Sequence, residues 1–78
     1  MIDGGTIPSM KRLRLTSPRL DFWVDVSVLS REGRWVATAM IAGEPMLGWA
    51  DSQRDAIAAA LEILGVEAVS ELLASMNT

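Results

Sequence analysis

Catalytic chemistry in this sequence would have to rest on carboxylate and hydroxyl side chains, because its 78 residues include no cysteine and no histidine. That composition removes the thiol nucleophile, the imidazole base that works near neutral pH and the commonest metal ligands. Asp21 and Asp25 form the best-spaced carboxylate pair. Such a pair performs acid–base catalysis only inside a cleft that separates the two pKa values. The surrounding sequence indicates no cleft, so we expect these two aspartates to solubilise one face of a strand.

The hydroxyl and glycine patterns do not point to a catalytic centre either. Ser52 stands beside Asp51 and close to Asp55, with no base among them. This arrangement is typical of a helix N-cap rather than of a nucleophile. The glycines match no phosphate-binding spacing. We therefore predict that the protein is not an enzyme, with no catalytic residue, no metal site and no cofactor.

The elements that position these side chains begin with a hairpin. "LDFWVDVSVL" (20–29) alternates apolar and polar residues, "SREG" (30–33) is a turn, and "RWVATAMIA" (34–42) is the return strand. A four-residue loop at 30–33 pairs residues whose numbers sum to 63, which places Val26 opposite Ala37 and Val24 opposite Ala39. One face of the hairpin is then apolar on both strands.

A third short strand and two helices follow the hairpin. "LGWA" (47–50) is strand-like, and residues 52–64 have apolar residues at helical spacing up to Gly65. "VEAVSELLASM" (66–76) predicts a shorter second helix. The expected fold is α+β: a three-stranded antiparallel sheet with the alanine-rich helix packed on one face and a short C-terminal helix.

The first 19 residues differ from the rest in charge. They hold four basic residues against Asp3, a balance of +3, whereas residues 20–78 hold three arginines against nine acids, a balance of −6. We predict a flexible basic arm over 1–19 and a single α+β domain over 20–78. "KRLRLT" (11–16) also alternates like a short strand, and translation can start at Met1 or Met10.

Large apolar side chains fall on the face that the core does not need. The predicted pairing leaves Trp23 outward and opposite Met40. With a four-residue turn at 43–46, Met40 lies opposite Trp49, and Leu47 joins the same strip. A three-residue turn would instead rotate Leu47 and Trp49 into the core, and the second helix or residues 10–16 could cover the strip. Exposed aromatic anchors are typical of protein interfaces, so these four residues are the predicted partner-binding surface.

The segment from residue 21 to 64 resembles the N-terminal domain of HicB-type antitoxins and their orphan relatives. The resemblance is carried by "RWVATA" (34–39) and "GWADSQRDAI" (48–57), where a strand leads into an acid-capped helix. It departs from the family at "AGEPML" (42–47), where a proline-glycine loop is usual. The resemblance implies a protein that masks a toxin nuclease. In size, acidity and general character the chain also resembles small phage inhibitors such as anti-CRISPR proteins.

The sequence thus predicts a cytoplasmic, non-catalytic protein-binding module that inhibits a partner protein. It has no apolar run that could span a membrane. Two alternatives remain: a homo-oligomeric module, such as a homodimer, and a nucleic-acid-binding protein. Nucleic acid is the less favoured partner because the body is acidic. Its contacts would come from the basic arm, at Lys11, Arg12, Arg14 and Arg19.

Overall fold

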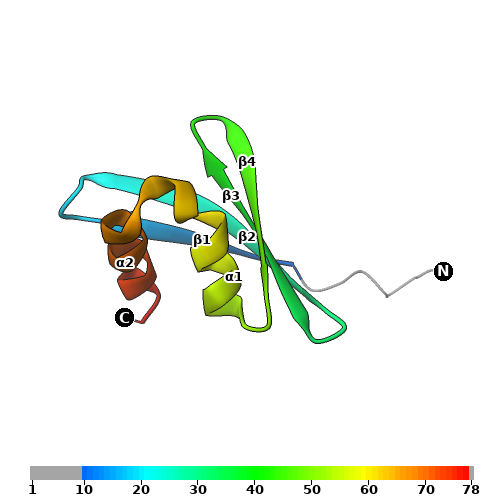
Figure 1. The fold of residues 1–78 in the computed structure, drawn as a ribbon. Helices are drawn as coiled ribbons and strands as arrows, with labels where there is room; N and C mark the ends of the chain where they lie inside the picture. Colours follow the sequence, from blue (N-terminus) through cyan, green and yellow to red (C-terminus); the bar gives the residue numbers. More distant parts are fainter. Residues whose placement is uncertain (1–9, 78) are drawn as a thin grey trace.

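The protein folds into two layers, a four-stranded antiparallel sheet and a pair of helices on one of its faces (Figure 1). The computed structural model describes residues 10–77. The strands are β1 (Met10–Ser17), β2 (Phe22–Arg31), β3 (Arg34–Ile41) and β4 (Glu44–Ala50), and they lie side by side in chain order. The helices are α1 (Gln53–Ala60) and α2 (Val66–Ala74), joined by the single 3-10 turn η1 (Glu62–Leu64), and η2 (Ser75–Asn77) follows.

The prediction of three strands is wrong because residues assigned to a flexible arm form β1. Met10–Ser17 pair with β2 over their whole length, from Met10 opposite Leu29 to Ser17 opposite Phe22. The apolar side of this strand is short: Leu15 is 2% exposed and Leu13 is half-buried. Burying the two leucines beside β2 stabilises the strand. The basic residues that alternate with them cost little free energy, because their charges stay in water and are not desolvated. Residues 18–19 of the predicted arm lie in the β1–β2 turn, and residues 1–9 lie outside the described residues.

Both later hairpins have shorter turns than we predicted. Glu32 and Gly33 form a two-residue turn with φ of 52° and 79°, and Ala42 and Gly43 form another with φ of 54° and 81°. Two successive positive φ values are typical of the type I′ turn, whose twist matches that of the flanking strands.

The predicted register is consequently wrong by an even number of residues. Val26 lies opposite Ala39 rather than Ala37, and Val28 lies opposite Ala37. Because side chains alternate with a period of two, an even shift changes the partners but not the face. Val24, Val26 and Ala39 therefore still point into the core.

The helices cover the inner face of the sheet. Ser52 caps α1 by accepting a hydrogen bond from the Asp55 amide at 3.2 Å. Gly48 of β4 lies directly under α1: a Cβ built there would collide with the Ala56 carbonyl oxygen and the Ala60 amide nitrogen. This close approach brings both layers together around one core, formed by Leu15, Val24, Val26, Val28, Ala37, Ala39, Ala56, Ile57, Ala60, Leu61, Leu72 and Leu73.

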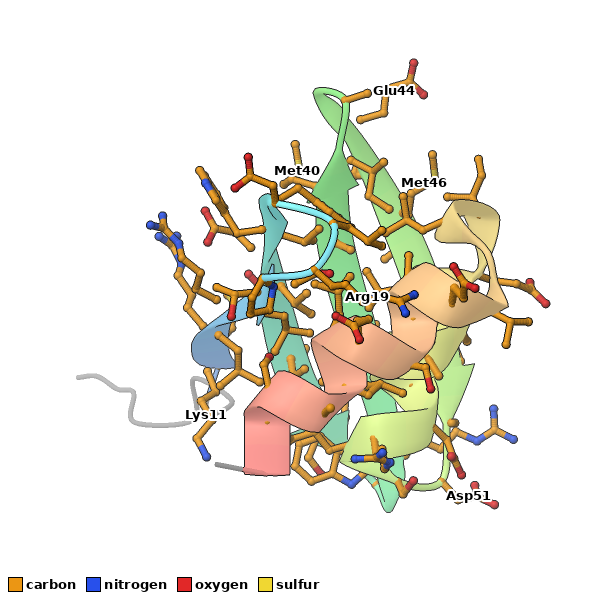
Figure 2. All side chains as sticks on the ribbon, turned by 90° about the vertical axis from the view of Figure 1, so that its left-hand side faces the viewer. Lys11, Arg19, Met40, Glu44, Met46 and Asp51 are labelled. Atoms are coloured by element: carbon orange, nitrogen blue, oxygen red, sulfur yellow. The ribbon has the colours of Figure 1, made fainter. Side chains whose placement is uncertain are left out.

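Hydrogen bonds and ion pairs connect α2 to β1 and to the β1–β2 turn. The Ser17 hydroxyl, 1% exposed, donates to Glu71 Oε1 at 3.2 Å and accepts from the Leu20 amide at 3.3 Å. Arg19 reaches over α2, where it pairs with Glu67 at 3.2 Å and with Glu71 at 3.8 Å (Figure 2). At the C-terminal end of the same helix the hydroxyl of the C-cap residue Ser75 accepts a hydrogen bond from the Thr16 amide. Part of the β1 edge is thus covered by the helical layer.

Candidate binding face

The face of the sheet opposite the helices is the candidate functional surface. No helix or strand within residues 10–77 packs on it, since α1 and α2 both lie on the inner face (Figure 1). The strand alternation and register assign sixteen side chains to this outer face. They are Met10, Arg12, Arg14, Thr16, Trp23, Asp25, Ser27, Leu29, Arg31, Arg34, Val36, Thr38, Met40, Pro45, Leu47 and Trp49.

All four residues of the predicted partner-binding surface lie on the outer face. Trp23 is 53% exposed, Met40 50%, Leu47 61% and Trp49 59%. Neither α2 nor residues 10–16 cover them, because α2 lies on the opposite face and β1 extends the sheet at its edge. The turn at Ala42 and Gly43 also leaves Leu47 and Trp49 outside the core.

The structure does not gather these four residues in the predicted order. Trp49 lies opposite Val36, Leu47 opposite Thr38, and Met40 opposite Pro45. Trp23 pairs with Thr16 of β1 instead of Met40. The outer face therefore has two separate aromatic ends rather than one strip.

One end is built around Trp49. Met10, Leu29, Val36 and Trp49 occupy successive strands in register and form an apolar row across the whole sheet. Leu29 and Val36 are half-buried, while Met10 and Trp49 are largely exposed. Sequence reasoning missed this row because it depends on the register of all three hairpins. The alternation around Leu29 and Val36 was the available signal, but it did not identify their neighbours.

The other end is built around Trp23. The guanidinium of Arg14 lies 4.0 Å from the centre of the Trp23 ring, and its Nε donates to Asp25 Oδ1 at 3.0 Å. Leu29 lies six positions after Trp23 along β2, which corresponds to about 20 Å along an extended strand. Trp23 and Trp49 therefore belong to different ends of the face.

A shallow hollow of about 340 Å³ lies beside the β2–β3 turn at the Trp49 end. Its lining combines the apolar side chains of Leu29, Val36 and Trp49 with the charged residues Arg31, Glu32 and Arg34. Arg31 and Arg34 are directly opposite each other in the last residue pair before the turn. The hollow thus combines apolar surface with two neighbouring positive charges.

Charge is divided between the two layers. The outer face holds Arg12, Arg14, Arg31 and Arg34 against the single acid Asp25, a balance of +3. Residues 51–77, which form the helical layer, hold Arg54 against five acids, a balance of −4. The helical layer is the side that faces the viewer in Figure 2.

The remaining residues singled out in the sequence are dispersed. Arg12 and Arg14 lie on the outer face, Lys11 faces the other way, and Arg19 is held by the two glutamates of α2. Asp21 lies in the β1–β2 turn with φ of 56°, and Asp25 is paired with Arg14. Among the described residues, no three acidic side chains gather where they could hold a metal ion. The helices of this part of the chain are too short to cross a membrane.

Comparison with known proteins adds no assignment. No family model, no curated protein and no solved structure matches the chain. The resemblance to HicB-type antitoxins therefore stays a prediction.

Proposed function

We propose that this protein is a non-catalytic binding module that inhibits a partner protein by masking it with the outer face of the sheet. The observation that carries the proposal is the outer face, on which no helix or strand of residues 10–77 packs: its four largest exposed apolar side chains on β2, β3 and β4 are each at least 50% exposed. Large exposed apolar side chains gathered on one face of a small domain are typical of an interaction site. A cytoplasmic setting fits the resemblance to HicB-type antitoxins.

The residue types of the outer face support a protein partner. Tryptophan, methionine and arginine are enriched in the centres of protein interfaces, whereas lysine and glutamate are depleted. The outer face carries two tryptophans, two methionines and four arginines, with no lysine and no glutamate. Its composition therefore matches an interface more closely than an ordinary solvated sheet face.

The charge of the outer face argues against a symmetric homodimer as the main assembly. In a two-fold interface the same patch meets itself. Two outer faces would then bring together eight arginines and only two aspartates, and like charges in a buried interface are costly. A partner with an acidic, partly apolar surface fits better.

Nucleic acid is the second candidate, and one observation favours it. Arg12 and Arg14 lie on the same face as Trp23, so the basic residues and an aromatic ring are brought together as single-strand binding requires. However, Arg14 is already paired with Asp25, and Arg19 is paired on the helical side. Fewer basic side chains are therefore free to contact phosphate than the sequence of the predicted arm indicated.

Site-specific photocrosslinking in the native cell tests the proposal. A photoreactive phenylalanine analogue replaces Leu47 on the outer face, and in a matched variant it replaces Ile63, which is 68% exposed on the helical layer. We expect Leu47 to crosslink to a defined protein and Ile63 to crosslink to none. Crosslinking from Ile63 alone, or from Leu47 to nucleic acid only, would contradict the proposal.

Once the partner is known, Trp23→Ala measures the contribution of the second aromatic end. A buried tryptophan anchor contributes about 2 kcal/mol or more to binding. We expect calorimetry to show this loss while the melting midpoint changes little, because Trp23 lies outside the core. A variant that unfolds without any loss of partner affinity would make Trp23 a structural residue.

A further inference from the structure

The hollow at the Trp49 end contains two arginines that the fold does not use. Arg31 and Arg34 are exposed and face each other across the β2–β3 hairpin. Like charges directly opposite each other destabilise a hairpin. Within residues 10–77 neither guanidinium has an ion pair or a side-chain hydrogen bond, in contrast to Arg14 and Arg19. Folding alone therefore gives no reason for this pair.

The apolar part of the hollow lies directly beside these charges. Leu29 and Val36 precede and follow the hairpin pair on the same face, and Trp49 lies opposite Val36. The Trp49 side chain is 59% exposed, so most of its surface is available to a ligand. A ligand that fits this hollow has negative charge next to an apolar group.

We propose that the hollow binds an acidic segment of the partner protein, with its carboxylates on Arg31 and Arg34 and a neighbouring apolar side chain on Leu29, Val36 and Trp49. Arginine forms paired, charge-assisted hydrogen bonds with carboxylates, which gives both affinity and orientation. This assignment rests on the proposed function and names the chemistry of the partner.

A nucleic acid fits the hollow less well. Farther along the same face Arg14 is already paired with Asp25, so a continuous phosphate backbone would find few further free cations there. The two arginines of the hollow also form one pair at the turn instead of a groove along a strand. A short acidic segment needs only that pair.

The test uses the whole chain and a short peptide in which one phenylalanine is flanked by aspartates and glutamates. Two further ligands are compared: the same peptide with asparagine and glutamine, and single-stranded oligothymidylate. Nuclear magnetic resonance titration follows the arginine Nε–H and tryptophan indole N–H signals. We expect the acidic peptide alone to shift the signals of Arg31, Arg34 and Trp49, with affinity that falls as salt is added.

Variants locate the site. Arg31→Gln with Arg34→Gln, and separately Trp49→Ala, should each weaken the acidic peptide by about tenfold or more, as expected for the loss of charged hydrogen bonds or an aromatic anchor. Arg54→Gln and Ile63→Ala, both exposed on the helical layer, are the matched controls and should leave the affinity unchanged. The double arginine variant should melt at the same or a higher temperature, because it removes a like-charge pair.

Three results would overturn the assignment: no shift at these residues, equal binding of the amide peptide, or tighter binding of oligothymidylate through the same arginines. The photocrosslinking experiment keeps the two proposals separate. Crosslinking from Leu47 without peptide binding would retain the inhibitor function and reject the acidic segment. Peptide binding without crosslinking would retain the hollow and reject the masking of a partner protein.

Discussion

Adding one methyl group at Gly48 should separate the two layers of the fold. The Cβ of Gly48→Ala would collide with the Ala56 carbonyl oxygen and the Ala60 amide nitrogen. Both obstructing atoms belong to the backbone of α1, so no side-chain rotation relieves the contact. The helix must move away from β4, and its buried residues Ile57 and Leu61 must move with it.

The magnitude follows from the cost of overpacking. Inserting a methyl group into a packed core costs about 1–3 kcal/mol when side chains can adjust. Here only a shift of the whole helix can relieve the contact. We therefore expect the free energy of unfolding to fall by an amount near the upper end of this range, about 3 kcal/mol. A domain of this length has a total stability of about 4–12 kcal/mol. The melting midpoint should therefore fall by about 12–24 °C.

Circular dichroism melts and urea unfolding of the wild type and Gly48→Ala measure this loss. A second variant, Gly48→Ala with Ala56→Gly, tests the mechanism. Because the obstruction is the Ala56 carbonyl and not its methyl group, the second change should give no rescue. A midpoint for Gly48→Ala within a few degrees of the wild type would refute the close approach of α1 to β4. Full rescue by Ala56→Gly would show that the obstructing group was a side chain.

Two further substitutions test the turn and the polar contact that the sequence did not reveal. Ala42→Gly should raise the free energy of unfolding by about 0.5–1 kcal/mol, since Ala42 has φ of 54° and glycine adopts this conformation without steric cost; an unchanged or lower urea midpoint would contradict the type I′ turn. Ser17→Ala should lower it by about 1–2 kcal/mol, because it removes the acceptor of the Leu20 amide and a donor to Glu71 in a buried position; a neutral effect would show that water replaces the hydroxyl.

The alternation of apolar residues predicted which side chains enter the core. The lengths of the turns determine which of these residues lie opposite each other on neighbouring strands. Val24, Val26, Ala37 and Ala39 were all expected on the buried face, and each is at most 4% exposed. Their pairing was wrong because both two-residue turns place a residue other than glycine at positive φ, namely Glu32 and Ala42. Asparagine or aspartate before glycine usually marks such turns. Without that signal, longer loops were the natural prediction.

The first strand was missed for a different physical reason. Its charged residues Lys11, Arg12 and Arg14 suggested a solvated arm, but all three side chains stay exposed in the folded strand, Arg12 and Arg14 on the outer face and Lys11 near the start of the strand on the other side. Only Leu13, Leu15 and the hydroxyl of Ser17 needed to face the core. Ser17 is buried by its contacts with the turn and with α2, which lies more than fifty positions along the chain. No local pattern contains that contact.

In the candidate site, too, the face of a side chain follows from the local sequence, whereas its neighbours follow from the register between strands. An even error in register leaves every side chain on its own face, so Trp23 and Met40 point outward despite the wrong pairing. The face of Leu47 and Trp49 depended in the sequence on the length of the second turn, and the two-residue turn places both on the outer face. The neighbours of these side chains could not be predicted. A register error of two residues shifts one strand by about 7 Å relative to the next and so gives each side chain a different cross-strand partner.

This shift in register determines which side chains lie next to each other on the outer face. The predicted register joined Trp49 to Met40, whereas the observed register joins it to Val36 and Leu29, beside the Arg31–Arg34 pair. The apolar side chains alone would suit many partners, but Arg31 and Arg34, which have no ion pair within residues 10–77, favour one that brings negative charge. The two-residue turn at Glu32 and Gly33 is what puts these arginines opposite each other, so the specificity we propose depends on the hairpin geometry rather than on any sequence motif.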